Sequence, residues 1–135
     1  AVSPIGPVRQ VLTYAISEIP SRKILMGQNL YGYDWTLPFV QGTTARAISP
    51  QQAINLARRY NVPISYDNDA QAPYFKYRDG EGKEHEVWFE DARSIQAKFN
   101  LIKELNLRGM SYWKLGLSFP QNWLLIENNF TVTKK

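Results

Sequence analysis

The sequence has no cysteine among its 135 residues, and it has a single histidine, His85. Without cysteine the chain can form neither a disulfide nor a thiolate metal site, and it cannot use a cysteine nucleophile. One histidine cannot build a zinc site unaided. We therefore expect neither a metal nor a cofactor to be bound by these residues.

Long apolar runs and blocks of positive charge are also absent. No stretch approaches the roughly 20 apolar residues that a membrane-spanning helix needs, so no membrane span is expected. The formal net charge is +4, and no long block of adjacent Lys or Arg occurs. Nucleic acid is therefore not the expected partner.

The chain does not begin with Met and opens with AVSPIGP, so we expect it to be part of a longer protein.

The composition is globular, with 44% hydrophobic and 21% charged residues. Helical spacing of apolar residues predicts a helix over 7–19, and a mainly apolar run predicts a strand over 23–30 that is buried on both faces. A second such strand is predicted over 108–116, between helices predicted over 92–105 and 119–130. Helices that alternate with apolar strands are typical of an α/β fold with a parallel sheet.

The middle of the chain has a different pattern. The sequence SPQQ at 49–52 has the spacing of a capping box with proline in the first helical turn, which predicts a helix over 50–60. Further on, DGEG separates two runs that predict an antiparallel hairpin, 72–78 and 83–90. A short strand is predicted over 64–67. These elements predict a small α+β unit between the two apolar strands.

Both apolar strands end in aromatic residues. After ILMGQNL the sequence continues YGYDW, and the strand over 108–116 contains a Tyr-Trp pair. In a parallel sheet or barrel, the carboxyl ends of the strands form the ligand site. We therefore expect the following side chains to gather at one edge: Tyr31, Tyr33, Trp35, Tyr112 and Trp113.

Three segments, KILMGQNLYGYDW, VWFEDARSIQAK and LRGMSYWKLGL, together resemble the C-terminal part of a glycoside hydrolase family 18 barrel. The resemblance covers nearly the whole chain and is strongest to the spore-cortex peptidoglycan N-acetylglucosaminidases of Bacillus-like spore formers. It implies an α/β fold, with the last two strands and flanking helices of a TIM (β/α)8 barrel carrying a small α+β insertion domain. Gln28-Asn29 departs from the family pattern, which usually has an apolar residue and a proline there.

The resemblance also implies a division of the chain. Residues 1–35 would hold the sixth barrel helix and the seventh strand, residues 36–106 the insertion and the seventh helix, and residues 107–135 the eighth strand and the last helix. The two barrel strands would lie side by side and parallel. Their bare faces and edges would be covered by the missing N-terminal part of the barrel or by a second copy of the chain.

The activity implied by the resemblance is hydrolysis of an N-acetylglucosamine-containing polysaccharide, with spore-cortex peptidoglycan preferred over chitin. In this family the acetamide of the substrate is the nucleophile, so the protein supplies one general acid. That acid lies in the motif Asp-x-x-Asp-x-Asp-x-Glu, which has no match in this chain. No catalytic residue is therefore expected here, and the chain alone is predicted to be inactive. The implied location is the spore cortex or coat, the cell wall or the exterior of a Bacillus-like bacterium.

The resemblance implies that the aromatic residues bind the substrate. Trp113 would form the floor beneath the sugar at the cleavage site, and Tyr31 would line the same subsite, with Tyr33 and Tyr112 expected nearby. The residues alone leave other readings open, because Trp113 could be a core residue at a strand end and Tyr31 could bond a backbone carbonyl. Asp34 could bind sugar hydroxyls or cap the following turn. Trp35 could be an outer sugar platform or could pack under the insertion.

The other polar groups of the middle region are expected to be solvated. The segment 67–69, Asp-Asn-Asp, resembles the start of a calcium loop but lacks its later glycine and glutamate. His85, between two glutamates on a hairpin arm, is expected to be exposed. Two other functions fit the same aromatic residues: a non-catalytic carbohydrate-binding or structural module, and an interaction domain in which the aromatics form the core.

Overall fold

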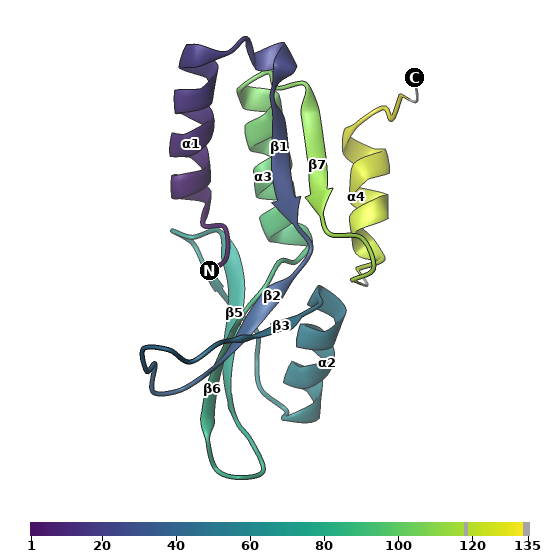
Figure 1. The fold of residues 1–135 in the computed structure, drawn as a ribbon. Helices are drawn as coiled ribbons and strands as arrows, with labels where there is room; N and C mark the ends of the chain where they lie inside the picture. The colour runs from purple at the N-terminus through teal and green to yellow at the C-terminus, as the bar shows by residue number, and fades with distance from the viewer. Residues whose placement is uncertain (118, 134–135) are drawn as a thin grey trace.

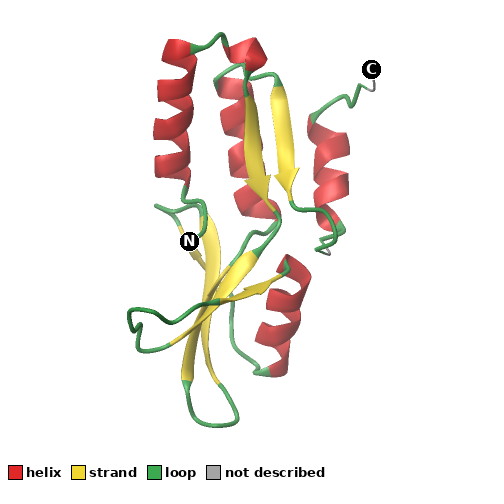
Figure 2. Ribbon diagram, viewed as in Figure 1, coloured by secondary structure: helices red, strands yellow, loops and turns green. Residues whose placement is uncertain are grey.

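The computed structural model describes residues 1–117 and 119–133, which form two sheets arranged one beyond the other (Figure 1; Figure 2). The helices are α1 (Ile5–Glu18), α2 (Pro50–Arg59), α3 (Ala92–Glu104) and α4 (Gln121–Asn129), with a short 3₁₀ turn at Ser21–Lys23. The strands are β1 (Leu25–Asn29), β2 (Gly32–Thr36), β3 (Arg46–Ile48), β4 (Ser65–Asp67), β5 (Ala72–Arg78), β6 (Glu84–Trp88) and β7 (Gly109–Trp113). Within the residues described, no helix has the length and apolar character needed to cross a bilayer.

The smaller sheet is the pair β1 and β7, which lie side by side and run parallel, as predicted. Leu25 pairs with Gly109 at the start of the ladder, and Asn29 pairs with Trp113 at its end. Parallel strands need a long crossover, and the chain between them supplies it. Both strands are shorter than predicted, since β1 begins only after the 3₁₀ turn and β7 ends at Trp113.

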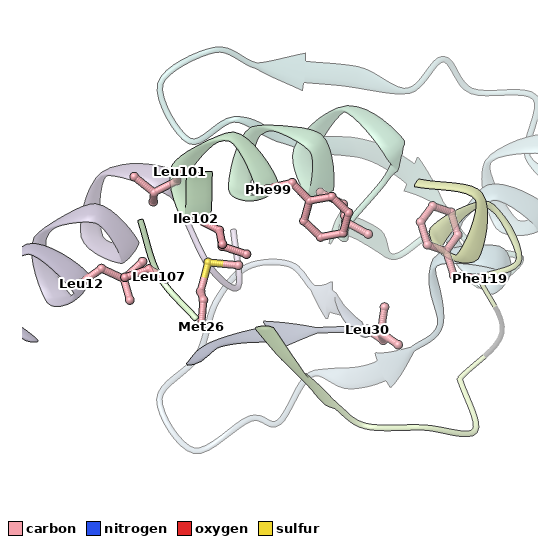
Figure 3. Packing of buried hydrophobic residues seen from close by; sticks show 9 residues of the cluster. Leu12, Met26, Leu30, Phe99, Leu101, Ile102, Leu107 and Phe119 are labelled. Carbon is pink, nitrogen blue, oxygen red and sulfur yellow. The ribbon is translucent and has the colours of Figure 1, made fainter. Parts of the chain in front are cut away.

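One face of this strand pair is packed against helices. Met26 of β1, together with Leu30 just beyond it, meets Phe99 and Ile102 of α3 in a buried cluster (Figure 3). Leu12 of α1 and Phe119, which precedes α4, belong to the same cluster (Figure 3). The helix predicted over 92–105 is thus confirmed as α3, and Phe99 and Ile102 are buried along its inner face.

The other face of the strand pair is open. Met26 is buried on the helix side, whereas Leu25 is 50% exposed and Trp113 is 70% exposed. Within this chain the strands are therefore buried on the helix side only, and the prediction of burial on both faces is confirmed for that side alone. Helices cover one face of the strand pair. Among the described residues, no second layer of helices or strands covers the other face.

The larger sheet has the strand order β3-β2-β6-β5-β4, and every neighbouring pair is antiparallel. Its core lies between one face and α2, where Ala53 packs with Phe75 and Val87. Ser49 caps α2 as predicted: its hydroxyl accepts from the Gln52 N–H (3.1 Å), and the Gln52 side chain accepts from the Ser49 N–H (2.7 Å). The predicted hairpin is also confirmed, as β5 and β6.

Two strands of the larger sheet were not predicted. The first apolar strand was predicted to stop at residue 30, with YGYDW following its end, but Gly32–Thr36 is a strand of its own, β2, and it pairs with Arg46–Ile48, β3. The alternation of bulky with small or polar residues in YGYDW has the period-two pattern of a strand. The first helix also begins earlier than expected, at Ile5 rather than Pro7.

Candidate functional site

The two parallel strands end beside each other at the edge that faces the larger sheet (Figure 1). The ladder extends one residue past β1, where the Leu30 N–H donates to the Trp113 carbonyl (2.8 Å). Tyr31 then leads directly into β2. The backbone thus holds Trp113 at the end of one strand, and Tyr31 just beyond the end of the other.

The predicted pair Tyr112 and Trp113 is divided between the two faces of β7, because consecutive side chains of a strand point to opposite sides. Trp113 is on the open side, and a cis peptide bond joins it to Lys114. Tyr112 packs on the helix side, where its hydroxyl donates to Asn122 Oδ1 (3.0 Å) and burial raises its pKa. The structure therefore does not bring Tyr112 together with Trp113.

A row of aromatic rings runs from this edge along the larger sheet. The ring centroids of Tyr31 and Tyr33 are 5.5 Å apart, those of Tyr33 and Trp35 5.8 Å, and those of Trp35 and Phe39 5.6 Å, and each pair meets edge to face. Phe39 is 61% exposed and the other three rings are half-buried. Burial raises the pKa of the Tyr31 hydroxyl. The structure thus brings together three predicted aromatics and adds Phe39.

Gly32 allows this row to pass close to the end of β6. A Cβ atom at Gly32 would lie 2.3 Å from the Trp88 carbonyl oxygen and 2.6 Å from the Phe89 Cβ. Real Cβ atoms do not come so close to other atoms, so only glycine fits here without moving one of the strands. The glycine of YGYDW therefore has a packing role, which is the close approach of β2 to β6.

Asp34 lies on the opposite face of β2 from the aromatic row and is only 4% exposed. Its carboxylate accepts hydrogen bonds from the Tyr77 hydroxyl, the Arg46 guanidinium and His85 Nδ1, each at 2.9 Å. Burial, and next the hydrogen bond to Asp34, raises the pKa of Tyr77. The expectation that Asp34 caps a turn is wrong, since it lies within a strand. It also points away from the row, and the structure does not bring the two together.

His85 was expected to be exposed, and this is wrong. Its ring lies between two carboxylates, with Nδ1 2.9 Å from Asp34 and Nε2 3.3 Å from Asp79, and it stacks on Tyr77 at 4.5 Å between centroids. Backbone N–H groups, above all that of Lys83, lower the pKa of Asp79. The histidine is therefore part of the network that fixes the hairpin against β2.

The segment 67–69 leads from the end of β4 into a turn at residues 68–71. The Asp67 carboxylate accepts from the backbone N–H groups of Asp69 (3.0 Å) and Ala70 (2.7 Å). Across residues 1–117 and 119–133, no three His, Asp or Glu side chains are placed so that they could hold a metal ion.

A hollow of about 490 Å³ opens beside the aromatic row. Its walls are formed by Tyr33, Trp35 and Phe39, by Glu86 and Trp88 of β6, and by Ala1 and Val2. The Trp88 indole N–H donates to Glu86 (2.6 Å). Aromatic walls with one carboxylate can pack the C–H faces of a sugar ring and accept hydrogen bonds from its hydroxyls.

Comparison with known proteins agrees with this geometry. The model for glycosyl hydrolases family 18 matches residues 7–117. The chain belongs to this family. The cortical fragment-lytic enzyme of Bacillus subtilis (strain 168) is 71% identical to it over 136 residues, which cover 100% of this chain and 32% of that protein. The family that the three sequence segments suggested is therefore confirmed.

Two solved structures superpose closely on this chain. The spore cortex-lytic enzyme SleL of Bacillus megaterium QM B1551 matches with a TM-score of 0.97 and 74% identity, over 98% of this chain and 31% of that one. SleL of Bacillus cereus matches with a TM-score of 0.97 and 65% identity, over 98% of this chain and 32% of that one. The chain thus spans about a third of the length of the relatives that it matches.

A buried ion pair between Glu90 and Lys98 was not predicted from the sequence. Glu90 is 1% exposed and Lys98 is 2% exposed, and Lys98 Nζ lies 2.7 and 2.8 Å from the two Glu90 oxygens. Glu90 was expected to be solvated with the other carboxylates of the region. The sequence could have indicated this pair, because Lys98 lies on the buried face of α3 next to Phe99, where a lysine needs an acidic partner.

Proposed function

We propose that this chain is part of a family 18 glycosidase that hydrolyses the N-acetylglucosamine-containing glycan of spore-cortex peptidoglycan. The observation that carries the proposal is the exposed indole of Trp113 at the strand ends, in a chain so similar to a cortical fragment-lytic enzyme. Sugar rings have apolar C–H faces, and a flat exposed indole gives those faces area to bury. The indole lies at the carboxyl end of β7, on the face that would line the barrel interior, and the carboxyl ends of barrel strands are where ligands bind in this fold.

In this proposal β1 and β7 are the seventh and eighth strands of a (β/α)8 barrel. Their parallel pairing supports it, and so does the position of the helices on one face only, since the other face would line the barrel interior. Residues 1–35 and 107–135 would be the barrel segments, and residues 36–106 the insertion domain with the seventh helix. The open face and free edges would be covered by the rest of the barrel, with a second copy of the chain as the alternative.

The chain would supply the wall and floor of the sugar groove. Trp113 and Tyr31 would line the subsite at the cleavage point, and Tyr33 and Trp35 would continue the groove along β2. Tyr112 and Asp34 were expected to bind substrate. In this proposal they would not contact it but would stabilise β7 and β2 through their hydrogen bonds to Asn122 and Tyr77.

The chemistry would be substrate-assisted retaining hydrolysis, in which the acetamide of the substrate attacks the anomeric carbon. The general acid and the carboxylate that orients the acetamide would come from the rest of the protein, because this chain lacks the motif that carries them. The absence of a general acid alone typically removes a factor of about 10²–10⁴ in rate.

The spore cortex is the proposed place of action, in keeping with the names of the relatives. The test compares the protein that contains this chain with the chain alone, using a fluorogenic N-acetylglucosaminide and cortex fragments. We expect the whole protein to cleave the cortex fragments and the chain alone to give no turnover above a buffer blank. A whole protein that binds the glycan without cleaving it would instead identify a non-catalytic carbohydrate-binding module.

A further inference from the structure

The chain crosses between the two sheets at two neighbouring points (Figure 1). It passes from β1 to β2 through Leu30 and Tyr31, and it returns from β6 to α3 through the segment 89–91. The crossings are close, because Gly32 touches the backbone of Phe89. A group of buried polar side chains lies at this junction.

The ion pair of Glu90 and Lys98 is the centre of the group. Besides Lys98, the Ser94 hydroxyl donates to Glu90 (2.7 Å). Burial raises the pKa of Glu90, and the effects of Lys98, Ser94 and Asn29 oppose that rise. Two charges withdrawn from water carry a large desolvation cost, and apolar side chains of similar size often give equal or greater stability. The pair is therefore poorly explained by stability alone.

Asn29 connects the ion pair to the aromatic residues. Its Nδ2 donates to the Tyr31 carbonyl (2.9 Å), and its Oδ1 accepts from the Ser3 hydroxyl (2.9 Å). Asn29 is also the residue that pairs with Trp113 across the ladder. Asn29 is also one of the groups that lower the pKa of the Glu90 carboxyl against the effect of burial. The polar group thus reaches the backbone of both residues proposed to line the cleavage subsite.

We propose that Glu90, Lys98 and Asn29 are positioning residues that hold Tyr31, and the aromatic row that follows it, at a fixed place relative to Trp113. A glycan that rests on Trp113 and on the row at once needs the two surfaces at a set distance and angle. The buried pair supplies this because its geometry has little freedom. The inference rests on the proposed function, and it gives a role to the segment FEDARSIQAK, which the aromatic site does not use.

The test uses the whole protein that contains this chain. The double variant Glu90→Gln/Lys98→Met removes both charges and leaves neither one buried alone. The control is Arg9→Met/Glu104→Gln, which removes the exposed pair between α1 and α3 (2.8 Å) far from the strand ends. At a temperature where all proteins are folded, we expect the double variant to raise KM for cortex glycan and to lower kcat/KM by about 10–100-fold, because small displacements of positioning groups have effects of that order. The control should match the unsubstituted protein.

Hydrogen exchange gives a measurement that does not depend on activity. Amides of residues 30–36 and 111–113 should exchange faster in the double variant, and unchanged in the control. A pair that served only stability would lower the melting temperature and leave KM and kcat per folded molecule unchanged, and that result overturns the inference. So does unchanged exchange in both segments.

Two other results would call for a different comparison: a double variant that does not fold, and an unsubstituted protein that does not bind the glycan. If the double variant does not fold, Asn29→Ala takes its place with the same expectations, because it removes the link to Tyr31 and keeps the ion pair. If the unsubstituted protein neither binds nor cleaves the glycan, the proposed function fails. The exchange measurement then decides alone whether Glu90, Lys98 and Asn29 position Tyr31 relative to Trp113.

Discussion

Tyr112 and Trp113 are consecutive residues of β7, and their side chains lie on opposite faces of the strand pair. The Tyr112 hydroxyl is bonded to Asn122 on the helix side, whereas the Trp113 indole faces outward with most of its surface exposed. One aromatic side chain thus fixes the end of the strand, and the other is available to a ligand. The adjacent positions are expected to respond differently to substitution.

In the whole protein, Trp113→Ala should lower kcat/KM for cortex glycan by about 10–100-fold, as expected when an aromatic anchor of a binding site is truncated. Its stability should change little, because the indole is proposed to line the sugar groove and not the core, whereas a tryptophan buried in the core would cost about 3–5 kcal/mol. Steady-state kinetics and a thermal melt measure the two effects. The matched control is Trp123→Ala, which truncates a half-exposed indole on α4. A large fall in melting temperature with activity per folded molecule intact would show that Trp113 is a core residue.

Gly32→Ala should destabilise the protein by about 1–3 kcal/mol or more, since the new methyl group would overlap the Trp88 carbonyl and the Phe89 side chain. Gly6→Ala in α1 is the control. Nothing lies within 4 Å of a Cβ there, and alanine is favoured over glycine in a helix by up to about 1 kcal/mol. Urea unfolding of the three proteins measures both differences. Equal stability of the Gly32→Ala variant and the unsubstituted protein would contradict the close packing of β2 against β6.

The Tyr77 hydroxyl should make stability depend on pH in the alkaline range. Its pKa is raised in the folded protein by burial and by the bond to Asp34, above the ordinary tyrosine value of about 10. Its contribution is therefore complete below about pH 10 and is lost as the pH rises through the higher folded pKa. Tyr77→Phe should be less stable at pH 8 by about 1 kcal/mol, the usual net value of a hydrogen bond. The difference between the two proteins should narrow above pH 10. Unfolding midpoints from pH 8 to pH 11 test this, and a constant difference would contradict it.

The ion pair of Glu90 and Lys98 should show strong coupling in a double-mutant cycle. Glu90→Gln and Lys98→Met should each destabilise the protein by about 3–5 kcal/mol, because each leaves one charge buried without its partner. The double variant should be destabilised by much less than the sum of the two. Denaturant unfolding of the four proteins gives the coupling energy. Additive effects would mean that the two charges are not in contact when buried.

Much of the fold follows from local sequence patterns. The two parallel strands are mainly apolar runs, the helix over 50–59 begins with the capping box of Ser49 and Gln52, and the hairpin surrounds a turn made of glycine and acidic residues. Each of these signals lies within a few adjacent residues. The pairing of β1 with β7 follows once both are accepted as strands of one parallel sheet.

The parts that were not predicted depend on residues far apart in the sequence. Asp34 is buried because Arg46, Tyr77 and His85 come to it from three other segments, and no pattern near YGYDW shows that. The direction of Tyr112 depends on which face of β7 the helices cover. Phe39 was missed because it lies in the loop after β2, where strand alternation no longer applies.

The two crossings between the sheets have a consequence for how such a protein can change. β2 and β6, the strands by which the chain enters and leaves the larger sheet, are hydrogen-bonded neighbours, with Tyr33 opposite Trp88. The start and the end of this excursion are therefore about one strand spacing apart, roughly 5 Å. A segment whose two ends meet in this way can be shortened, enlarged or exchanged for another with little disturbance of β1, β7 or α3. The larger sheet can therefore be exchanged as a unit. The length of the proposed sugar groove could then evolve separately from the strand pair β1 and β7.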